Sequence, residues 1–245
     1  VELQTSATNT GSEKGDINVN AAVTWTSANS LTLSAHNDIN INANITATNN
    51  SGKLNLIYGT STANYYANTS NYYLNNGAKV NLKAGQNFST QKGADTARKI
   101  DYTVITDLGA AGSTTKTDLQ GMSGDLLWNY VLGADINAAA TSGWNGGLGF
   151  NPIGNNPNRF TGKFDGLNHT ISNLTINRQS QDYVGLFGVT NNSTIQNIGL
   201  IQANIKGYNR VGALIGEANS TNTSNAFSTG LVNGYQGVGG LVGVN

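Results

Sequence analysis

The stretch GDINVNA at residues 15–21 recurs almost letter for letter as NDININA at residues 37–43, which lies 22 positions further along the chain. The similarity continues with Val23-Thr24 against Ile45-Thr46 at the same offset, and with LTL at 31–33 against LNL at 54–56 at an offset of 23. Self-similarity at a fixed period of about 20–50 residues is typical of stacked repeats. The architecture is therefore expected to follow from these repeats.

Within each repeat, apolar and polar residues alternate, as in Ile17-Asn18-Val19. This period of two predicts short strands with one buried face. Three such strands, turned by Asn, Ser and Gly, predict one coil of a parallel β-solenoid, with equivalent residues about 4.8 Å apart in successive coils. The expected inward columns are Ile17 with Ile39, Val19 with Ile41 and Leu33 with Leu56. The expected outward columns are Asn18 with Asn40 and Asn20 with Asn42, and Val80-Asn81-Leu82 is expected to continue the 54–56 series at an offset of 26.

A second repeat, of 27 residues, occupies the last third of the chain. The runs VGLFG at 184–188, VGALIG at 211–216 and VGGLVG at 238–243 begin at equal spacing. Between them, Ile195 matches Thr223 and Lys206 matches Asn233. Glycines on both sides of an apolar pair indicate tight corners where backbones stack closely. We expect solenoid coils of wider circumference here, in an array that continues beyond the last residue of this sequence.

We therefore expect an all-β fold, a parallel β-helix in two sections at residues 1–85 and 128–245. Between them, at 86–127, the periodicity fades. This segment is expected to form an irregular joint with a short helix within 117–127, which two glycines weaken by about 1 kcal/mol each.

The composition supports a turn-rich β protein and excludes several other classes. The sequence has 31 Gly and 2 Pro, and its 13 basic residues balance its 13 acidic ones, so the net charge is zero. Nucleic acids and anionic membrane surfaces attract basic proteins, so neither is an expected partner. Without cysteine, neither a disulfide nor a thiolate metal site can form. No apolar run approaches about 18 residues, so no membrane-spanning helix is expected.

Several ordered motifs carry a resemblance to known proteins. They are YVLGADI at 130–136, PIG at 152–154, FTGKFDG at 160–166 and HTISNLTI at 169–176, followed by the three Val-Gly runs. This order resembles the GLUG-motif regions of large bacterial surface proteins. The first array, from residue 15 to about 82, is similar to the filamentous-haemagglutinin-type repeats of adhesins that Gram-negative bacteria export by two-partner secretion.

The resemblance implies a right-handed parallel β-helix that is secreted or displayed on the cell surface of a Gram-negative bacterium. It implies attachment to a host-cell glycan or protein receptor, or to biofilm polysaccharide, and an outer-membrane secretion partner for the parent protein. It implies no catalytic residue and no cofactor. The leading hypothesis is therefore a fragment of an adhesin without enzymatic activity, and the first alternative is a purely structural stalk.

A second alternative is an enzyme acting on polysaccharide, because parallel β-helices also carry such enzymes. Their chemistry needs carboxylates, or a carboxylate with a cation, converging on an open groove. We favour a solvated rim instead, with Asp165-Gly166 as a turn and His169 facing outward. The candidate cluster is Arg159, Lys163, Asp165, His169, Arg178 and Asp182.

A tyrosine-rich stretch is the strongest candidate for ligand binding. Asn-Tyr-Tyr at 64–66 recurs at 71–73, inside the longest insertion of the first array. Tyrosine offers a large, flat, amphipathic face at small entropic cost, which suits sugars and protein partners. Alternatively, every second tyrosine enters the core and the others cover it. The candidate binding residues are Tyr58, Tyr65, Tyr66, Tyr72 and Tyr73, together with Trp144 in the 143–159 loop.

Two further features are weaker. Asp16 and Asp38 stack at the 22-residue offset, but a calcium site needs about 6–8 oxygen ligands, so we expect turn residues and no metal site. Asn-x-Ser/Thr sequons number ten, whereas about seven are expected by chance. The candidate glycosylation sites are Asn44, Asn68, Asn87, Asn219 and Asn222.

Overall fold

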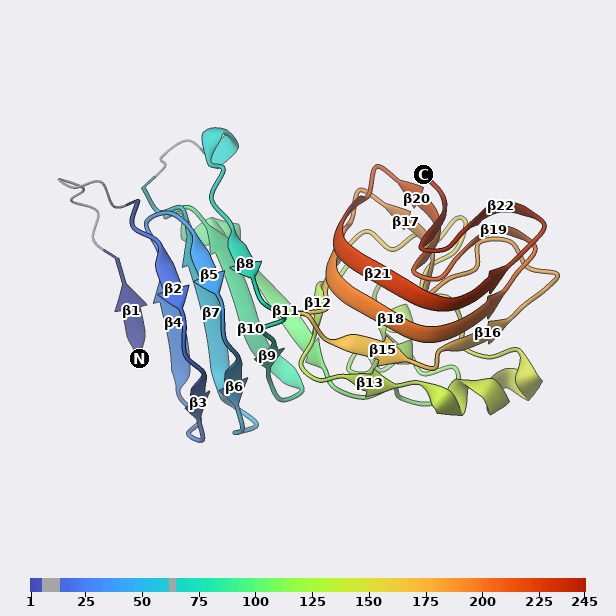
Figure 1. The fold of residues 1–245 in the computed structure, drawn as a ribbon, viewed down its shortest axis with the longest axis horizontal. Coiled ribbons are helices and arrows are strands. Elements are labelled where there is room, and N and C mark those ends of the chain that lie inside the picture. Colours follow the sequence, from blue (N-terminus) through green and yellow to red (C-terminus); the bar gives the residue numbers. More distant parts are fainter. Residues whose placement is uncertain (6–13, 62–64) are drawn as a thin grey trace. The chain divides into compact units, whose positions relative to one another are not determined.

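The computed structural model describes residues 1–5, 14–61 and 65–245. The chain divides into two compact units, Val1–Val104 and Ile105–Asn245. Both consist of β-strands, most of them in parallel pairs, with a few short 3-10 helices (Figure 1). The all-β fold expected from the repeats is confirmed. Within the described residues, no helix has the length and apolar character needed to cross a membrane.

The first unit contains three ladders of parallel strands. One ladder joins β2 (Ile17–Val19), β5 (Ile39–Ile41) and β8 (Tyr72–Leu74), and a second joins β3 (Val23–Trp25), β6 (Ile45–Ala47) and β9 (Val80–Asn81). The third joins β1 (Glu2–Gln4), β4 (Ser30–Ser34), β7 (Lys53–Tyr58) and β10 (Gly85–Lys92), with β11 (Lys99–Ile105) antiparallel to β10. Strands of one ladder lie side by side although a whole repeat separates them in the sequence (Figure 1).

The registers of these ladders confirm the expected columns. Ile17 pairs with Ile39 and Val19 with Ile41, and Leu33 pairs with Leu56. All of these side chains are buried. On the outer face, the Asn40 amide donates to Asn18 Oδ1 at 3.0 Å, and the Asn42 amide donates to Asn20 Oδ1 at 2.8 Å. An amide suits such a column because it carries both a donor and an acceptor.

The expected register of Val80-Asn81-Leu82 was wrong. Val80 pairs with Ile45, so it continues the ladder that begins at Val23. The strand that pairs with Leu54 in the next coil is instead the one that contains Phe88. The reason is the size of the insertion at residues 59–70. It raises the offset between paired residues to 33–35, so Val80 falls in the second ladder and not in the third. The sequence did not predict the strand at Phe88-Ser89-Thr90, because a polar residue, Thr90, stands where the repeat has an apolar one.

The segment expected to form an irregular joint contains regular structure. Besides β10 and β11 it holds two short 3-10 helices, η2 (Thr96–Arg98) and η3 (Gln120–Gly124). Phe88 on β10 packs against Tyr102 on β11 with ring centroids 5.4 Å apart. Cross-strand aromatic contact stabilises an antiparallel pair that the solenoid pattern did not predict.

The second unit is built around two long, curved strands, β18 (Thr194–Lys206) and β21 (Asn222–Asn233), which run side by side (Figure 1). On its other side β18 pairs with three short strands in succession, β14 (Lys163–Asp165), β15 (Thr170–Ser172) and β16 (Thr175–Asn177). The remaining elements are β12 (Tyr130–Leu132), β13 (Ile136–Asn137), η4 (Ala139–Gly147), β17 (Phe187–Asn191), β19 (Asn209–Gly212), β20 (Ile215–Asn219), β22 (Gln236–Gly239) and β23 (Val242–Val244); η1 (Tyr65–Ala67) lies in the first unit.

The 27-residue register is confirmed in this unit. Val184 pairs with Val211, which pairs with Val238, and Lys206 pairs with Asn233. Ile195 pairs with Thr223 at an offset of 28, and an irregularity between Leu200 and Ala203 absorbs the additional residue. Such a bulge places two residues of one strand opposite one residue of its neighbour.

Glycines let the backbones of successive coils approach at the corners. A Cβ on Gly216 would lie 2.7 Å from the carbonyl oxygen of Gly188, and a Cβ on Gly243 would lie 2.6 Å from that of Gly216. Real Cβ atoms do not come this close to backbone atoms, so the column Gly188, Gly216 and Gly243 requires residues without a side chain.

Replacing a residue of an inward column is expected to destabilise the first unit. Ile39 is fully buried between Ile17 and Tyr72, so Ile39→Ala leaves a cavity and should cost about 2–5 kcal/mol. Asn40→Ala removes one exposed hydrogen bond and should cost only about 0.5–1.5 kcal/mol. Urea midpoints followed by circular dichroism measure the difference, and equal midpoints for the two variants would contradict the columns.

The effect of a glycine substitution on stability is expected to depend on the position of the glycine. Gly216→Ala pushes a methyl group into backbone and should cost about 1–3 kcal/mol. Gly240→Ala has no heavy atom within 4 Å of the new Cβ and should change stability by no more than about 0.5 kcal/mol. Thermal unfolding midpoints check this pair, and a destabilised Gly240→Ala beside an unaffected Gly216→Ala would refute it.

Candidate functional site

The structure divides the tyrosine-rich stretch into buried and exposed members. Tyr58 ends β7 and Tyr72 begins β8, and both side chains are buried with ring centroids 5.7 Å apart. Tyr72 stands in the inward column above Ile39. These two tyrosines therefore belong to the core.

Tyr66 and Tyr73 face outward. The side chain of Tyr66, in η1, is 90% exposed, and that of Tyr73, in β8, is 40% exposed. The side chain of Tyr65 lies outside the described residues. Asn68 secures the end of this insertion, because its amide donates to the Gly59 carbonyl at 2.8 Å and its Oδ1 accepts the Ser70 N–H at 3.1 Å. Of the described tyrosines in the stretch, Tyr66 and Tyr73 are thus the ones that can contact a ligand.

Trp144 does not stand out as a binding platform. Its ring stacks on Phe150 with centroids 6.3 Å apart and an angle of 19° between the planes. Phe150 is fully buried, and Trp144 packs against the same apolar cluster. The indole thereby covers the core of the second unit.

A pair of exposed tyrosines in the second unit was missed. Tyr208 is 44% exposed and Tyr235 is 76% exposed, and their rings stack at a centroid distance of 5.4 Å with 8° between the planes. They occupy equivalent positions of successive coils, since the N–H of Tyr235 bonds to the carbonyl of Tyr208 at 2.7 Å. Their spacing of 27 residues was the signal in the sequence.

The candidate catalytic cluster contains two residues that are not on a solvated rim, so that expectation was wrong. Asp165 is 2% exposed, and its carboxylate accepts the Leu167 N–H at 2.8 Å, the Gln196 amide at 2.8 Å and the Asn197 amide at 2.9 Å. The turn expected at Asp165-Gly166 is present, and this carboxylate stabilises it.

His169 was expected to face outward but is only 1% exposed. It precedes the buried Ile171 by two residues, and residues two apart on an extended chain share a face. Its Nδ1 lies 3.2 Å from Asp135 Oδ1. This contact links two neighbouring coils.

The cations of the cluster have separate surroundings. Burial lowers the pKa of Lys163 and, by the same cause, the pKa of Arg178. The Arg178 guanidinium bonds to the Phe150 carbonyl at 3.2 Å, to Gln181 at 3.2 Å and to Asn151. Asp182 accepts the Asn209 N–H of the next coil at 3.2 Å. Asp165, Arg178 and Asp182 thus make contacts that hold the coils together.

Asp16 and Asp38 act as turn residues that bond between coils. Asp16 Oδ1 accepts the Asp38 N–H at 3.0 Å, and Asp38 Oδ1 accepts the Asn71 N–H at 2.8 Å. Across the described part of the chain, no group of three or more His, Cys, Asp and Glu side chains is placed to hold a metal ion.

The candidate glycosylation sites differ in access. Asn68 and Asn87 are buried, and the Asn87 amide donates to three backbone carbonyls at 2.9–3.2 Å. Asn44 and Asn222 are exposed, and Asn219 is partly buried. A glycan attached to Asn68 or Asn87 would replace the hydrogen bonds of a buried amide.

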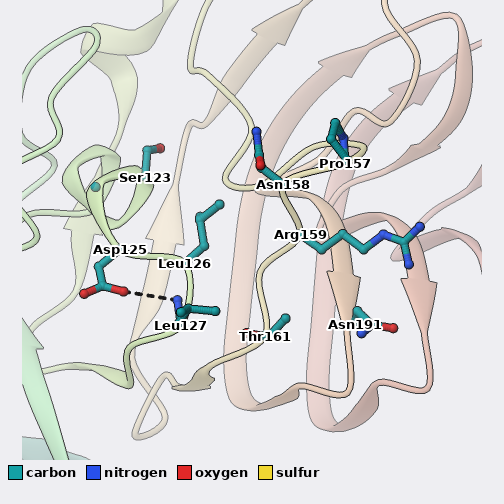
Figure 2. Close-up of a pocket in the computed structure, with 10 residues that line it drawn as sticks. Ser123, Asp125, Leu126, Leu127, Pro157, Asn158, Arg159, Thr161 and Asn191 are labelled. Atoms are coloured by element: carbon teal, nitrogen blue, oxygen red, sulfur yellow. Dashed lines mark hydrogen bonds between the residues drawn. The ribbon is translucent and has the colours of Figure 1, made fainter.

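An open groove of about 670 Å³ in the second unit is a further candidate site that the sequence did not reveal (Figure 2). It joins the end of η3, the loop that precedes β14 and the end of β17. These segments are far apart in the sequence, so no local motif marks them. The lining residues are Ser123, Gly124, Asp125, Leu126, Leu127, Pro157, Asn158, Arg159, Thr161 and Asn191.

Backbone hydrogen bonds hold the walls of this groove. The N–H groups of Thr161 and Gly162 donate to the Leu126 carbonyl at 2.9 and 3.2 Å. Phe160 is fully buried and is bonded on both sides to β17, through the Val189 carbonyl at 3.0 Å and the Asn191 N–H at 2.9 Å. Because Phe160 points inward, its neighbours Arg159 and Thr161 are directed toward the groove.

The acidic wall of the groove is neutralised within the protein. Asp125 Oδ2 lies 3.3 Å from Lys116 Nζ, and its Oδ1 accepts the Leu127 N–H at 3.2 Å. The Tyr130 hydroxyl donates to the Asp125 carbonyl at 2.8 Å. Burial, and secondarily the charge of Asp125, raise the pKa of Tyr130, so this phenol keeps its proton at neutral pH.

No family model and no solved structure matches this chain. It is 46% identical over 121 residues to halomucin of Haloquadratum walsbyi, a match that covers 47% of this chain and 1% of that protein. It is 30% identical over 169 residues to the immunoglobulin A1 protease of Streptococcus sanguinis, covering 66% of this chain and 8% of that protein. A Gly-rich membrane protein of Evansella cellulosilytica is 45% identical over 56 residues, which cover 22% of this chain and 6% of that protein.

The chain spans less than a tenth of the length of each of these relatives, so they are much larger proteins. They do not support the resemblance to GLUG-motif or filamentous-haemagglutinin proteins at the level of a family. Halomucin is archaeal and the protease comes from a Gram-positive bacterium, so a Gram-negative origin gains no support. The protease likewise gives no support to the expectation that the chain has no enzymatic activity.

The two tyrosines of β8 are expected to respond differently to substitution. Tyr72→Ala empties a buried site next to Tyr58 and should cost about 3–5 kcal/mol. Tyr73→Ala removes an exposed ring and should change stability by about 0.5 kcal/mol or less. Urea denaturation distinguishes them, and equal losses of stability would refute the assignment of Tyr72 to the core.

Proposed function

We propose that this chain is a section of a large adhesin that is secreted or displayed on the cell surface, built as a parallel β-solenoid in two sections. The relatives are large surface or secreted proteins, which supports a location outside the cell. The 22- and 27-residue registers support the solenoid architecture, because residues one repeat apart are neighbours across parallel ladders.

The observation that carries the adhesive role is the exposure of tyrosine side chains on an insertion in a regular scaffold. Tyr66 is 90% exposed, although burial of an aromatic ring is favourable. Loops on rigid scaffolds commonly carry binding functions. The proposed receptor is a host-cell glycan or protein, or a biofilm polysaccharide.

A stalk is the second candidate function, and the polar ladders favour it. The Asn42 amide bonds to Asn20, and the Asn75 amide bonds to Asn42 at 2.9 Å, so this column continues through three coils. A column of this kind stiffens the scaffold. Its asparagines are alike and bond to one another, so it presents no distinct group for a ligand to recognise. In a stalk, the receptor site would lie in another part of the parent protein.

The exposed tyrosines are expected to be required for adhesion. We expect the purified chain to bind saturably to a glycan array or to epithelial cells. The double variant Tyr66→Ala and Tyr73→Ala should lose this binding while its circular-dichroism spectrum stays unchanged. The matched control is Tyr208→Ala with Tyr235→Ala, which also removes two exposed rings but should retain binding.

Failure of the well-folded wild type to bind would favour the stalk. Loss of binding in both double variants would show that exposed aromatic surface in general is responsible, and would contradict a site in the tyrosine-rich stretch.

A further inference from the structure

One arginine side chain in the groove of the second unit has no partner among the residues that the structure describes. The chain contains four arginines. Arg98 pairs with Asp95 at 3.4 Å, Arg210 pairs with Glu217 at 2.6 Å, and Arg178 bonds to its neighbouring carbonyl groups. Among the described residues, none forms a hydrogen bond or an ion pair with the guanidinium of Arg159.

Arg159 is nevertheless partly buried and its backbone is held in place. The next residue, Phe160, is anchored in the core and fixes the direction in which Arg159 extends. Figure 2 shows its side chain running past Asn191, on the side of the groove opposite Asp125. The guanidinium of a partly buried arginine that has no partner among the described residues is suited to an anion, and its planar fork fits a carboxylate with two parallel hydrogen bonds.

The charge balance of the groove also favours an anion. Asp125 is the one carboxylate among the lining residues, and Lys116 neutralises it from outside the groove. Arg159 is therefore the one lining charge that nothing in the described protein compensates. A carboxylate bound near Arg159 would meet little repulsion from the opposite wall.

The other lining groups are neutral and of two kinds. Ser123 and Thr161 carry hydroxyl groups, and Asn158 and Asn191 carry amides, all of which both donate and accept hydrogen bonds. Leu127 is 75% exposed and provides an apolar edge. Hydroxyl and amide groups suit the hydroxyls of a sugar, and an exposed leucine suits the C–H face of its ring.

We propose that this groove binds a carboxylated sugar unit, a uronic acid within an acidic polysaccharide, with the carboxylate on the guanidinium of Arg159. The volume of about 670 Å³ falls within the range of about 300–1,000 Å³ that is usual for ligand sites. None of the lining residues belongs to the tyrosine-rich stretch. The occupation of the groove depends neither on that stretch nor on where the parent protein is displayed.

The test uses trigalacturonate as the probe and titrates the full chain by isothermal calorimetry. We expect saturable binding that weakens with added salt and that is lost when the probe is replaced by its methyl ester, which has the same hydroxyls and no charge. Arg159→Gln should lower the affinity at least about tenfold. Arg159→Lys keeps the charge but loses the fork, so it should retain intermediate affinity.

Arg98→Gln is the matched control, because it removes the same charge from an exposed position in the other unit and should leave the affinity unchanged. An unchanged thermal midpoint in each variant shows that folding is intact. Absence of binding, equal binding of the methyl ester, or full affinity in Arg159→Gln would each overturn the proposal. Arg159-dependent binding of inorganic phosphate or of a peptide carboxylate, without binding of trigalacturonate, would assign the guanidinium to a different anion and refute the sugar.

Discussion

The parallel backbone ladder is the interaction on which the rest of the structure depends. It places residues of the same position in successive coils one strand spacing apart, about 4.8 Å, so each position becomes a column of like residues. Apolar residues such as Ile17 and Ile39 bury one another in such a column, whereas like charges would repel at this distance. Asparagine suits the ladder because its NH2 group donates to the preceding repeat and its side-chain oxygen accepts from the following one. The low charge of the sequence, 11% of residues, follows from this constraint.

The few buried or partly buried acidic side chains follow the same constraint. Asp16, Asp38 and Asp182 each accept an N–H of the next coil, and Asp165 accepts one N–H and two side-chain amides. These carboxylates thereby serve as hydrogen-bond acceptors between neighbouring repeats.

Candidate functions arise where the chain departs from the repeat. Tyr66 in η1, which belongs to the insertion of the first array, is exposed, and the loop that precedes β14 brings Arg159 to a groove shared with η3 and β17. A column cannot easily supply a single charge or a single exposed ring, because a repeat places the same kind of residue in every coil. Departures from the repeat can do so, while the ladder holds them in place.

The sequence by itself determined the all-β class, the offsets of 22 and 27 residues and the outward asparagine columns, because a period of two and a fixed repeat follow directly from ladder geometry. It did not determine which strand pairs with Leu54 in the next coil, because a long insertion changes the offset and polar residues conceal the alternation around Phe88. Only the tertiary structure decided which tyrosines are buried and which residues meet around Arg159. Burial depends on neighbours supplied by other coils, and those neighbours are distant in the sequence.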